Sequence, residues 1–75
     1  MMTIEQALAL TPGGFKLFYF IADMDTAYYR DRNGNEIHKL RGIYYAQYNG
    51  KWSGNLDSLE AAQAWLNDKK KWWGK

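Results

Sequence analysis

Cysteine is absent from this 75-residue chain, and proline and histidine occur once each. Without cysteine, the chain forms no disulfide framework and no zinc site of the cysteine type. A metal site would need scattered carboxylates, and no calcium-loop spacing is present. The one histidine, His38, has no acidic partner evident in the sequence, which is typical of a structural residue. The sequence therefore predicts no metal site and no cofactor.

Long apolar runs are absent too. The longest, residues 17–22, is far too short to cross a bilayer, and the amino terminus shows no signal-peptide pattern. These absences predict a cytoplasmic protein that does not associate with membranes.

Motifs for catalysis are also missing: the chain has no nucleophile motif, no phosphate-binding glycine loop and no metal-ligand spacing. The carboxylates of Asp23 and Asp25 fall where a turn is expected, and turn formation explains both. So short a chain also leaves little volume for a pocket. We therefore predict that the protein is not an enzyme.

Aromatic residues, by contrast, are abundant, at 17% of the chain. A chain of this length fills one core, so residues 1–75 are predicted to form a single domain. A core of that size is too small for every ring, and we expect some of them on the surface. Exposed tyrosine, tryptophan and arginine mark recognition sites.

The net charge of +2 is unevenly spread, with basic residues collecting in residues 26–52 and 69–75. This asymmetry falls short of the polybasic runs that indicate nucleic-acid binding by themselves.

The predicted elements follow from caps and turns. Thr3 and Gln6 have the spacing of a capping box for a short helix over residues 4–10, which the Thr-Pro-Gly-Gly of residues 11–14 ends. Residues 15–22 are apolar at odd and even positions, which favours a strand covered on both sides. Further strands are expected over residues 26–30, 36–48 and 51–56, with Asn49-Gly50 as a hairpin turn. Asp57 is expected to cap a main helix over residues 58–68.

These elements predict an α+β fold: a small antiparallel sheet of about four strands, with the carboxy-terminal helix packed on one face. The short amino-terminal helix is expected at an edge of the sheet or over its other face.

The hairpin register predicts which side chains share a face. A two-residue turn sets Tyr48 opposite Lys51 and Gln47 opposite Trp52. The face with Ile43, Tyr45, Trp52 and Leu56 is then the expected core face. A bulge at Gly42 would bring His38 and Leu40 to the same side. The predicted outer face consists of Tyr28, Arg30, Lys39, Arg41, Tyr44, Tyr48 and Lys51.

Three interpretations of this outer face stay open. It could be an ordinary solvated face, because tyrosine packs laterally and keeps its hydroxyl in water. It could bind a protein, because tyrosine and arginine supply rigid contact area. It could also bind nucleic acid, with rings stacking on bases and cations neutralising phosphates.

The Lys-rich end offers a second, accessory binding segment: Lys69, Lys70, Lys71, Trp72 and Trp73. Lysines suit a helix carboxy terminus, where they oppose the negative end of the dipole. The two tryptophans either fold back onto the core or are exposed for a partner.

Residues 41–66, RGIYYAQYNGKWSGNLDSLEAAQAWL, are similar to the ending of AP2-type and integrase arm-type DNA-binding domains, where a strand feeds a helix. The chain departs from that pattern in having an additional apolar strand before it and fewer basic residues on the sheet. The likeness rests on generic caps and hydrophobic spacing, so no family is assigned from it.

The function expected from these features is that of a non-enzymatic interaction module that binds and modulates or inhibits a larger host protein or nucleoprotein. In size and style the chain resembles small phage or mobile-element proteins that inhibit or redirect host machinery. The alternative is a DNA- or RNA-binding domain that uses the same face plus the Lys-rich end. Self-association into a homodimer is a third possibility.

Overall fold

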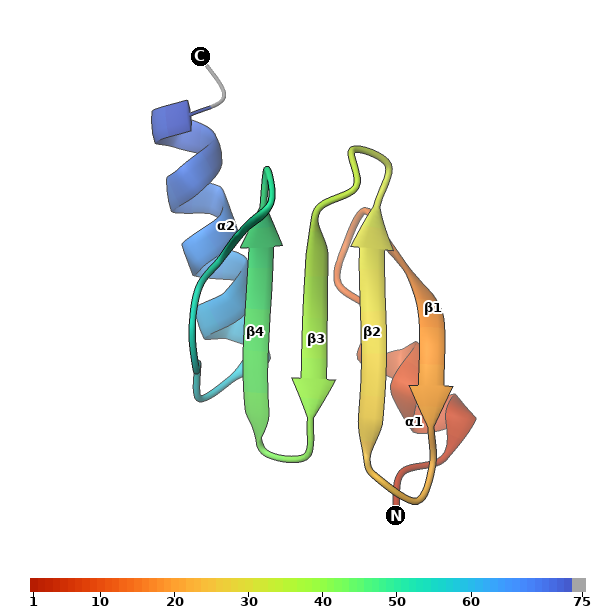
Figure 1. Ribbon diagram of the computed structural model, residues 1–75. Helices are drawn as coiled ribbons and strands as arrows, with labels where there is room; N and C mark the ends of the chain where they lie inside the picture. The colour runs from red at the N-terminus through yellow and green to blue at the C-terminus, as the bar shows by residue number, and fades with distance from the viewer. Residues whose placement is uncertain (74–75) are drawn as a thin grey trace.

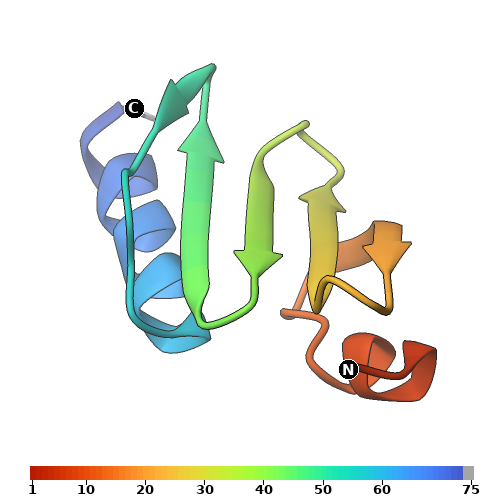
Figure 2. The ribbon, with the colours of Figure 1, turned by 60° about the horizontal axis from the view of Figure 1, so that its bottom comes forward.

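The computed structural model describes the backbone of residues 1–73 and the side chains of residues 1–69. A five-stranded antiparallel sheet in the order β1-β2-β3-β4-β5 carries two helices on one face (Figures 1 and 2). Helix α1 lies behind β1 and β2, and α2 packs on β4. The α+β fold is therefore confirmed, with five strands where about four were expected. Both helices cover the same face, which leaves the opposite face of the sheet without a helix.

The elements follow one another as neighbours. They are α1 (Ile4–Ala9), β1 (Phe15–Ile21), β2 (Thr26–Asp31), β3 (Glu36–Leu40), β4 (Ile43–Tyr48), β5 (Lys51–Trp52) and α2 (Leu59–Trp73). Every strand pairs with the next one along the chain, so short turns make all the connections within the sheet.

Both helices begin at hydrogen-bonded caps. In α1 the predicted capping box is present: Gln6 N–H donates to Thr3 Oγ1 at 3.1 Å, and Thr3 N–H donates to Gln6 Oε1 at 2.9 Å. In α2 the predicted cap was one residue off. Ser58, not Asp57, accepts from the backbone N–H of Ala61, at 3.0 Å.

The chain reverses at Arg41 and Gly42, where a continuous strand with a bulge was expected. Leu40 pairs with Ile43, so these two residues form a tight turn between β3 and β4. Arg41 adopts φ 58°, which an arginine rarely does. Its backbone N–H donates to Asp25 O at 3.0 Å, and its carbonyl accepts from Lys39 Nζ at 2.8 Å. One long-range and one local hydrogen bond thus hold a turn that the residue types alone do not indicate.

The turn between β2 and β3 is longer than the two-residue one considered from the sequence. Asp31 N–H donates to Asn35 O at 2.9 Å, and Gly34 takes φ 85° inside the loop. Arg30 is consequently paired with Glu36 and not with Ile37. This shift puts opposite charges next to each other across the strands.

The core lies between the sheet and the two helices. Its fully buried members come from both helices and from the middle strands: Ala7, Ala27, Tyr29, Ile37, Ala46, Ala62 and Leu66. Four of these seven are alanines, which let the helix backbones approach the sheet closely.

Two irregularities change the alternation along the strands. A bulge between Leu17 and Tyr19 in β1 puts Phe18 and Tyr19 on the uncovered face, while Leu17 and Phe20 pack against the core. The apolar residues at both odd and even positions of β1 suggested a strand covered on both sides, but only one side of β1 is covered. After β5, Gly54 at φ 81° shifts the pairing so that Leu56 lies opposite Tyr44, where Ile43 was expected.

No helix within residues 1–73 is both long enough and apolar enough to cross a bilayer.

Candidate interaction face

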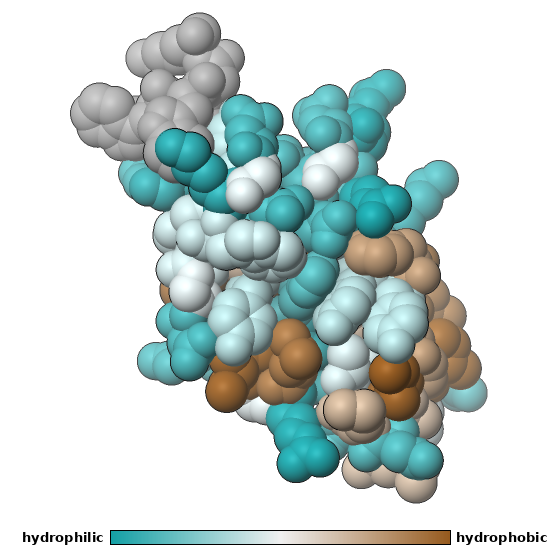
Figure 3. Space-filling model, viewed as in Figure 1, coloured by the Kyte–Doolittle hydropathy of each residue, from teal (hydrophilic) through white to brown (hydrophobic). Residues whose placement is uncertain are grey.

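The face of the sheet opposite the helices, called the open face below, is arranged in three rows that run across the strands. The strand pairing defines a polar row of Lys16, Arg30, Glu36, Gln47 and Trp52, an aromatic row of Tyr19, Tyr28, His38 and Tyr45, and an aliphatic row of Ile21, Thr26, Leu40 and Ile43. Figure 3 views this face, with hydrophilic side chains at its upper end and hydrophobic ones towards its lower end. Phe18, displaced by the bulge, lies against the aromatic row.

The rings of the aromatic row stack on one another. Tyr28 lies between Tyr19 and His38, with centroid distances of 4.8 Å and 3.8 Å and interplanar angles of 29° and 12°. Those two neighbours come from the strands on either side of β2, so they cover both faces of the Tyr28 ring. Rings stacked across the strands stand upright on the sheet and present their edges outward.

Three of the rings on the open face remain accessible. Phe18, Tyr19 and Trp52 keep 42%, 44% and 50% of their surface exposed. The expectation that some rings lie on the surface is therefore confirmed. Trp52 approaches His38 edge to face, with 4.9 Å between centroids.

A charged network fixes the polar row. Glu36 Oε2 accepts from Nε and Nη2 of Arg30, at 3.2 Å and 3.1 Å. Glu36 Oε1 lies 2.7 Å from Nε2 of His38, which is mostly buried. The guanidinium of Arg30 also lies 4.1 Å from the centroid of the Phe18 ring. Because Glu36 is committed on both oxygens, Arg30 and His38 are held in defined positions.

Of the seven residues predicted to share an outer face, only Tyr28 and Arg30 lie on the open face. The predicted positions of Tyr44, Tyr48 and Lys39 were wrong, because these residues lie on the face that the helices cover. Tyr48 is buried in the core cluster, and Tyr44 packs against it. Leu56, expected in the core, does pack against it. The other residues expected on that side lie on the open face instead: His38, Leu40, Ile43, Tyr45 and Trp52.

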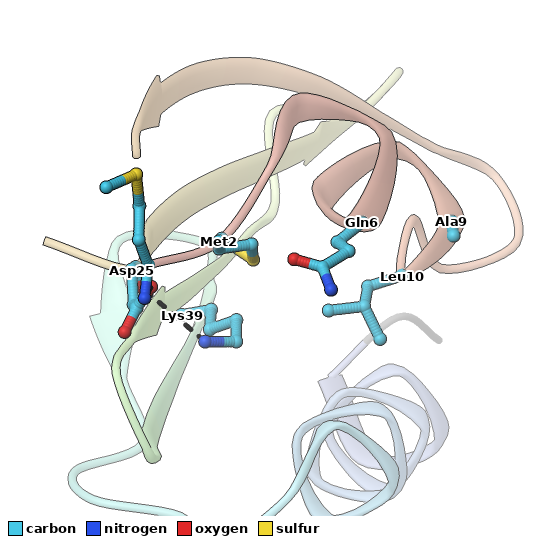
Figure 4. A pocket seen from close by; sticks show the side chains of 7 residues that line it. Met2, Gln6, Ala9, Leu10, Asp25 and Lys39 are labelled. Carbon is cyan, nitrogen blue, oxygen red and sulfur yellow. Dashed lines mark hydrogen bonds and ion pairs between the residues drawn. The ribbon is translucent and has the colours of Figure 1, made fainter. Parts of the chain in front are cut away.

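Lys39 has a structural position on the helix side. Its Nζ donates to the backbone oxygens of Asp25, at 3.3 Å, and Arg41, at 2.8 Å, and so connects two turns at one end of the sheet. It also lines a hollow of about 480 Å³ beside α1, together with Met1, Met2, Gln6, Ala9, Leu10 and Asp25 (Figure 4). The lysine is thereby separated from the aromatic row by the thickness of the sheet.

The other predicted cations are dispersed. Arg41 is exposed in its turn at the edge of the aliphatic row, and Lys51 is paired with Tyr48. Lys69 in α2 lies 5.4 Å from the centroid of the Trp65 ring. The side chains of Lys70, Lys71, Trp72 and Trp73 lie outside the described residues.

Reasoning from the sequence missed Phe18, Tyr19, His38, Tyr45 and Trp52 as members of the uncovered face. One available signal was the spacing of His38 and Glu36, since residues two apart on a strand point to the same side. That spacing identifies Glu36 as the acidic partner of His38.

Among the side chains of residues 1–69, no three histidine, aspartate or glutamate groups lie together in a way that could hold a metal ion. The open face is an uncovered surface of stacked rings between a polar and an aliphatic border. Comparison with family models, curated proteins and solved structures gives no match, so the open face is interpreted on its own chemistry.

Proposed function

We propose that this chain is a non-enzymatic interaction module whose open face binds a larger protein and modulates or inhibits it. The observation that carries the proposal is the aromatic row, which lies uncovered while both helices pack on the opposite face. Aromatic residues exposed side by side on a rigid support are the residues that dominate binding energy at protein interfaces.

The size of the open face is compatible with a specific protein interface. Strands about 4.8 Å apart and about 3.4 Å per residue give a face of about 20 Å in each direction. Its projected area is about 400 Å², and the relief of the side chains adds to that. A standard interface takes about 800 Å² from each partner, so a partner would engage most of this face.

The orientation of the rings favours a protein over nucleic acid. A base stacks on the face of a ring, as on single-strand-binding sheets. Both faces of Tyr28 are covered by Tyr19 and His38, and one face of Phe18 is covered by Arg30. Ring edges and hydroxyl groups suit the mixed apolar and hydrogen-bonding contacts of a protein surface.

The distribution of charge points the same way. A nucleic-acid backbone needs cations that follow its phosphates. Lys39, Arg41 and Lys51 do not lie among the rings, and Arg30 is engaged by Glu36. Of the basic residues that supported the DNA- or RNA-binding alternative, Lys39, Arg41 and Lys51 are thus separated from the rings, and Arg30, which lies over the Phe18 ring, is paired with Glu36.

The test compares two pairs of substitutions that remove similar apolar surface. Tyr19→Ser/Trp52→Ser alters the open face, and Ile4→Ser/Leu8→Ser alters α1, where those side chains are 44% and 55% exposed. Each variant is first checked for unaltered far-ultraviolet circular dichroism. Affinity capture from an extract of the source cells is then quantified by mass spectrometry, and a captured protein is purified and titrated against each variant.

We expect a protein that wild type and Ile4→Ser/Leu8→Ser bind equally and that Tyr19→Ser/Trp52→Ser binds at least about tenfold more weakly, since hot-spot rings are worth about 2 kcal/mol or more each. Equal binding by both variants would contradict the proposal. Binding of oligonucleotides that falls steeply with salt would favour the nucleic-acid alternative. A dimer of the wild type that Tyr19→Ser/Trp52→Ser dissociates would assign the open face to self-association.

A further inference from the structure

Three cations gather around one ring at the β1–β2 corner of the open face. A hollow of about 300 Å³ there, called the basic corner below, is lined by Gly14, Lys16, Phe18, Arg30, Asp31 and Arg32. It lies at the hydrophilic end of the face shown in Figure 3, next to the turn between β2 and β3. Its ring, Phe18, belongs to the same exposed surface as the aromatic row.

Two of the three cations of the basic corner, Lys16 and Arg32, have no ion pair within the part of the chain that the structure describes. Lys16 lies directly opposite Arg30 in the strand pairing, so two like charges are neighbours, an arrangement that is unfavourable in the free protein. Arg30 has its ion pair with Glu36, but no carboxylate among residues 1–69 pairs with Lys16 or Arg32.

The one acid of the basic corner is engaged in the turn. Oδ1 of Asp31 accepts from the backbone N–H groups of Asn33 and Asn35, both at 2.9 Å, and Oδ2 accepts from Nδ2 of Asn35 at 3.2 Å. These bonds hold the carboxylate towards the loop, and the three cations of the basic corner outnumber it beside an exposed ring.

We infer that the basic corner receives an acidic side chain from an acidic segment of the partner protein, with an adjacent apolar residue of that segment on the Phe18 ring. This inference rests on the proposed function, because it assigns the chemistry of the partner that the open face binds. A carboxylate received beside Lys16 and Arg32 offsets the like-charge contact of Lys16 with Arg30 and gains charge-assisted hydrogen bonds. The acidic side chain and the basic corner are thus complementary in charge, and this complementarity is confined to one corner of the open face.

The confinement favours a protein segment over a nucleic-acid strand. The aromatic row next to the basic corner carries no lysine or arginine, and the aliphatic row carries no charge. Among the described residues that form the three rows, lysine and arginine occur only at this corner, so a phosphate backbone crossing the aromatic and aliphatic rows would meet no cation within them. A peptide needs only one or two acidic residues there, followed by apolar residues for the remaining surface.

The probe is a fluorescein-labelled peptide in which aspartate and glutamate alternate with leucine and phenylalanine, beside a twin with asparagine and glutamine in place of the acids. Binding is followed by amide chemical shifts in ¹H–¹⁵N spectra and by fluorescence anisotropy. Lys16→Glu and Arg32→Glu, singly and together, are compared with Arg41→Glu, a charge reversal of equal size in an exposed turn remote from the basic corner.

The acidic peptide is expected to shift the amides of Lys16, Phe18 and Arg32. Lys16→Glu/Arg32→Glu is expected to bind the acidic peptide at least about fivefold more weakly, since the variant loses two exposed ion pairs and gains two like-charge contacts with the peptide. The twin peptide should bind the wild-type protein more weakly than the acidic peptide by a similar factor, and Arg41→Glu should bind the acidic peptide like wild type. The inference would be overturned if the twin bound with equal affinity or if Arg41→Glu lost as much affinity as the double variant. It would also be overturned if millimolar peptide caused no shifts, or if an oligothymidylate bound more tightly at the same amides.

The two proposals fail separately. If the purified partner still binds Lys16→Glu/Arg32→Glu but not Tyr19→Ser/Trp52→Ser, the open face is the interface and the acidic segment is wrong. If the partner binds both variants like wild type, the proposed function fails as well.

Discussion

The hydroxyl of Tyr29 connects the sheet to α1 by a hydrogen bond, and removing this hydroxyl tests how much the bond stabilises the fold. Tyr29 is fully buried, and its hydroxyl donates to the backbone oxygen of Ala7 at 2.6 Å. That oxygen belongs to the last turn of α1, where Thr11 N–H, its partner in a continued helix, donates to Leu8 O instead. The tyrosine therefore supplies the donor that the end of the helix lacks.

Tyr29→Phe keeps the ring and removes this one bond. An intramolecular hydrogen bond is worth about 1 kcal/mol net, and an unpaired buried carbonyl costs about 1–3 kcal/mol. We expect the free energy of unfolding to fall by about 1–3 kcal/mol. For a domain of this size each kcal/mol lowers Tm by about 4–8 °C, so the melting temperature should drop by at least about 4 °C.

Alkaline pH provides a second measure of the same group. Burial, and then the charge of neighbouring Tyr44, raise the pKa of Tyr29 above its ordinary value of 10.0. Since the folded-state pKa is the higher one, this contribution to stability is complete below about pH 10 and is lost as the pH rises through the folded-state pKa. The difference in stability between wild type and Tyr29→Phe should therefore shrink above pH 10.

The assay is urea unfolding followed by circular dichroism at pH 7, 9, 10.5 and 11, with exposed Tyr19→Phe as the control. A free energy of unfolding for Tyr29→Phe within about 0.5 kcal/mol of the wild-type value at pH 7 would contradict the role given to this hydrogen bond. That role would also be contradicted if the difference between the two proteins grew with pH.

Three further substitutions test the turns and the packing of the helices. Gly54→Ala should lower the free energy of unfolding by about 1–2 kcal/mol. A Cβ at this position meets no atom within 4 Å, so the loss comes from the positive φ of 81° and not from a clash. Gly42→Ala, equally open but without a positive φ, should lose no stability, and equal losses in urea unfolding would contradict the explanation. Asp31→Ala should lose about 1–3 kcal/mol with its three turn bonds, and a melting temperature equal to that of wild type would count against their role. Ala62→Leu should overpack the core by about 1–3 kcal/mol, whereas Ala64→Leu on the exposed side of α2 should be near neutral by calorimetry.

Local signals in the sequence determined the elements well. The capping box of Thr3 and Gln6 is present, and so is the pairing of Gln47 with Trp52 across the Asn49-Gly50 turn. Both depend on residues at most five apart, where the chemistry of a cap or a turn decides the geometry without help from the rest of the fold.

The assignment of faces failed in part because it depended on side-chain phase over long distances: Tyr28 pairs with His38 and not with Lys39. A slip of one residue sends every later side chain to the other side of the sheet. The bulge after Leu17, the turn at Arg41 and the shift at Gly54 each change the phase. The bulge falls at Phe18, and the positive φ of the turn falls at Arg41. Neither residue is a glycine, so the sequence pattern did not reveal them.

The core face was also predicted from the hydrophobicity of its side chains and not from their size. Ile43, Tyr45 and Trp52 make the more apolar set, and they were placed inside. The structure instead puts Ala46 inside, directly against Ile37, because a small residue there lets α2 lie close to β4. The candidate site was consequently predicted in part: Tyr28 and Arg30 belong to it, while its other rings were assigned to the core.

Photocrosslinking in the source cells tests directly whether the open face is the interface. The photoreactive residue p-benzoylphenylalanine is placed at Tyr45 on the open face or at Leu8 on α1, and covalent adducts are compared after illumination. If the open face is the interface, the protein labelled at position 45 should form one discrete adduct with another protein, and the protein labelled at position 8 should not. An adduct from position 8 alone, or adducts of nucleic acid alone from position 45, would contradict it.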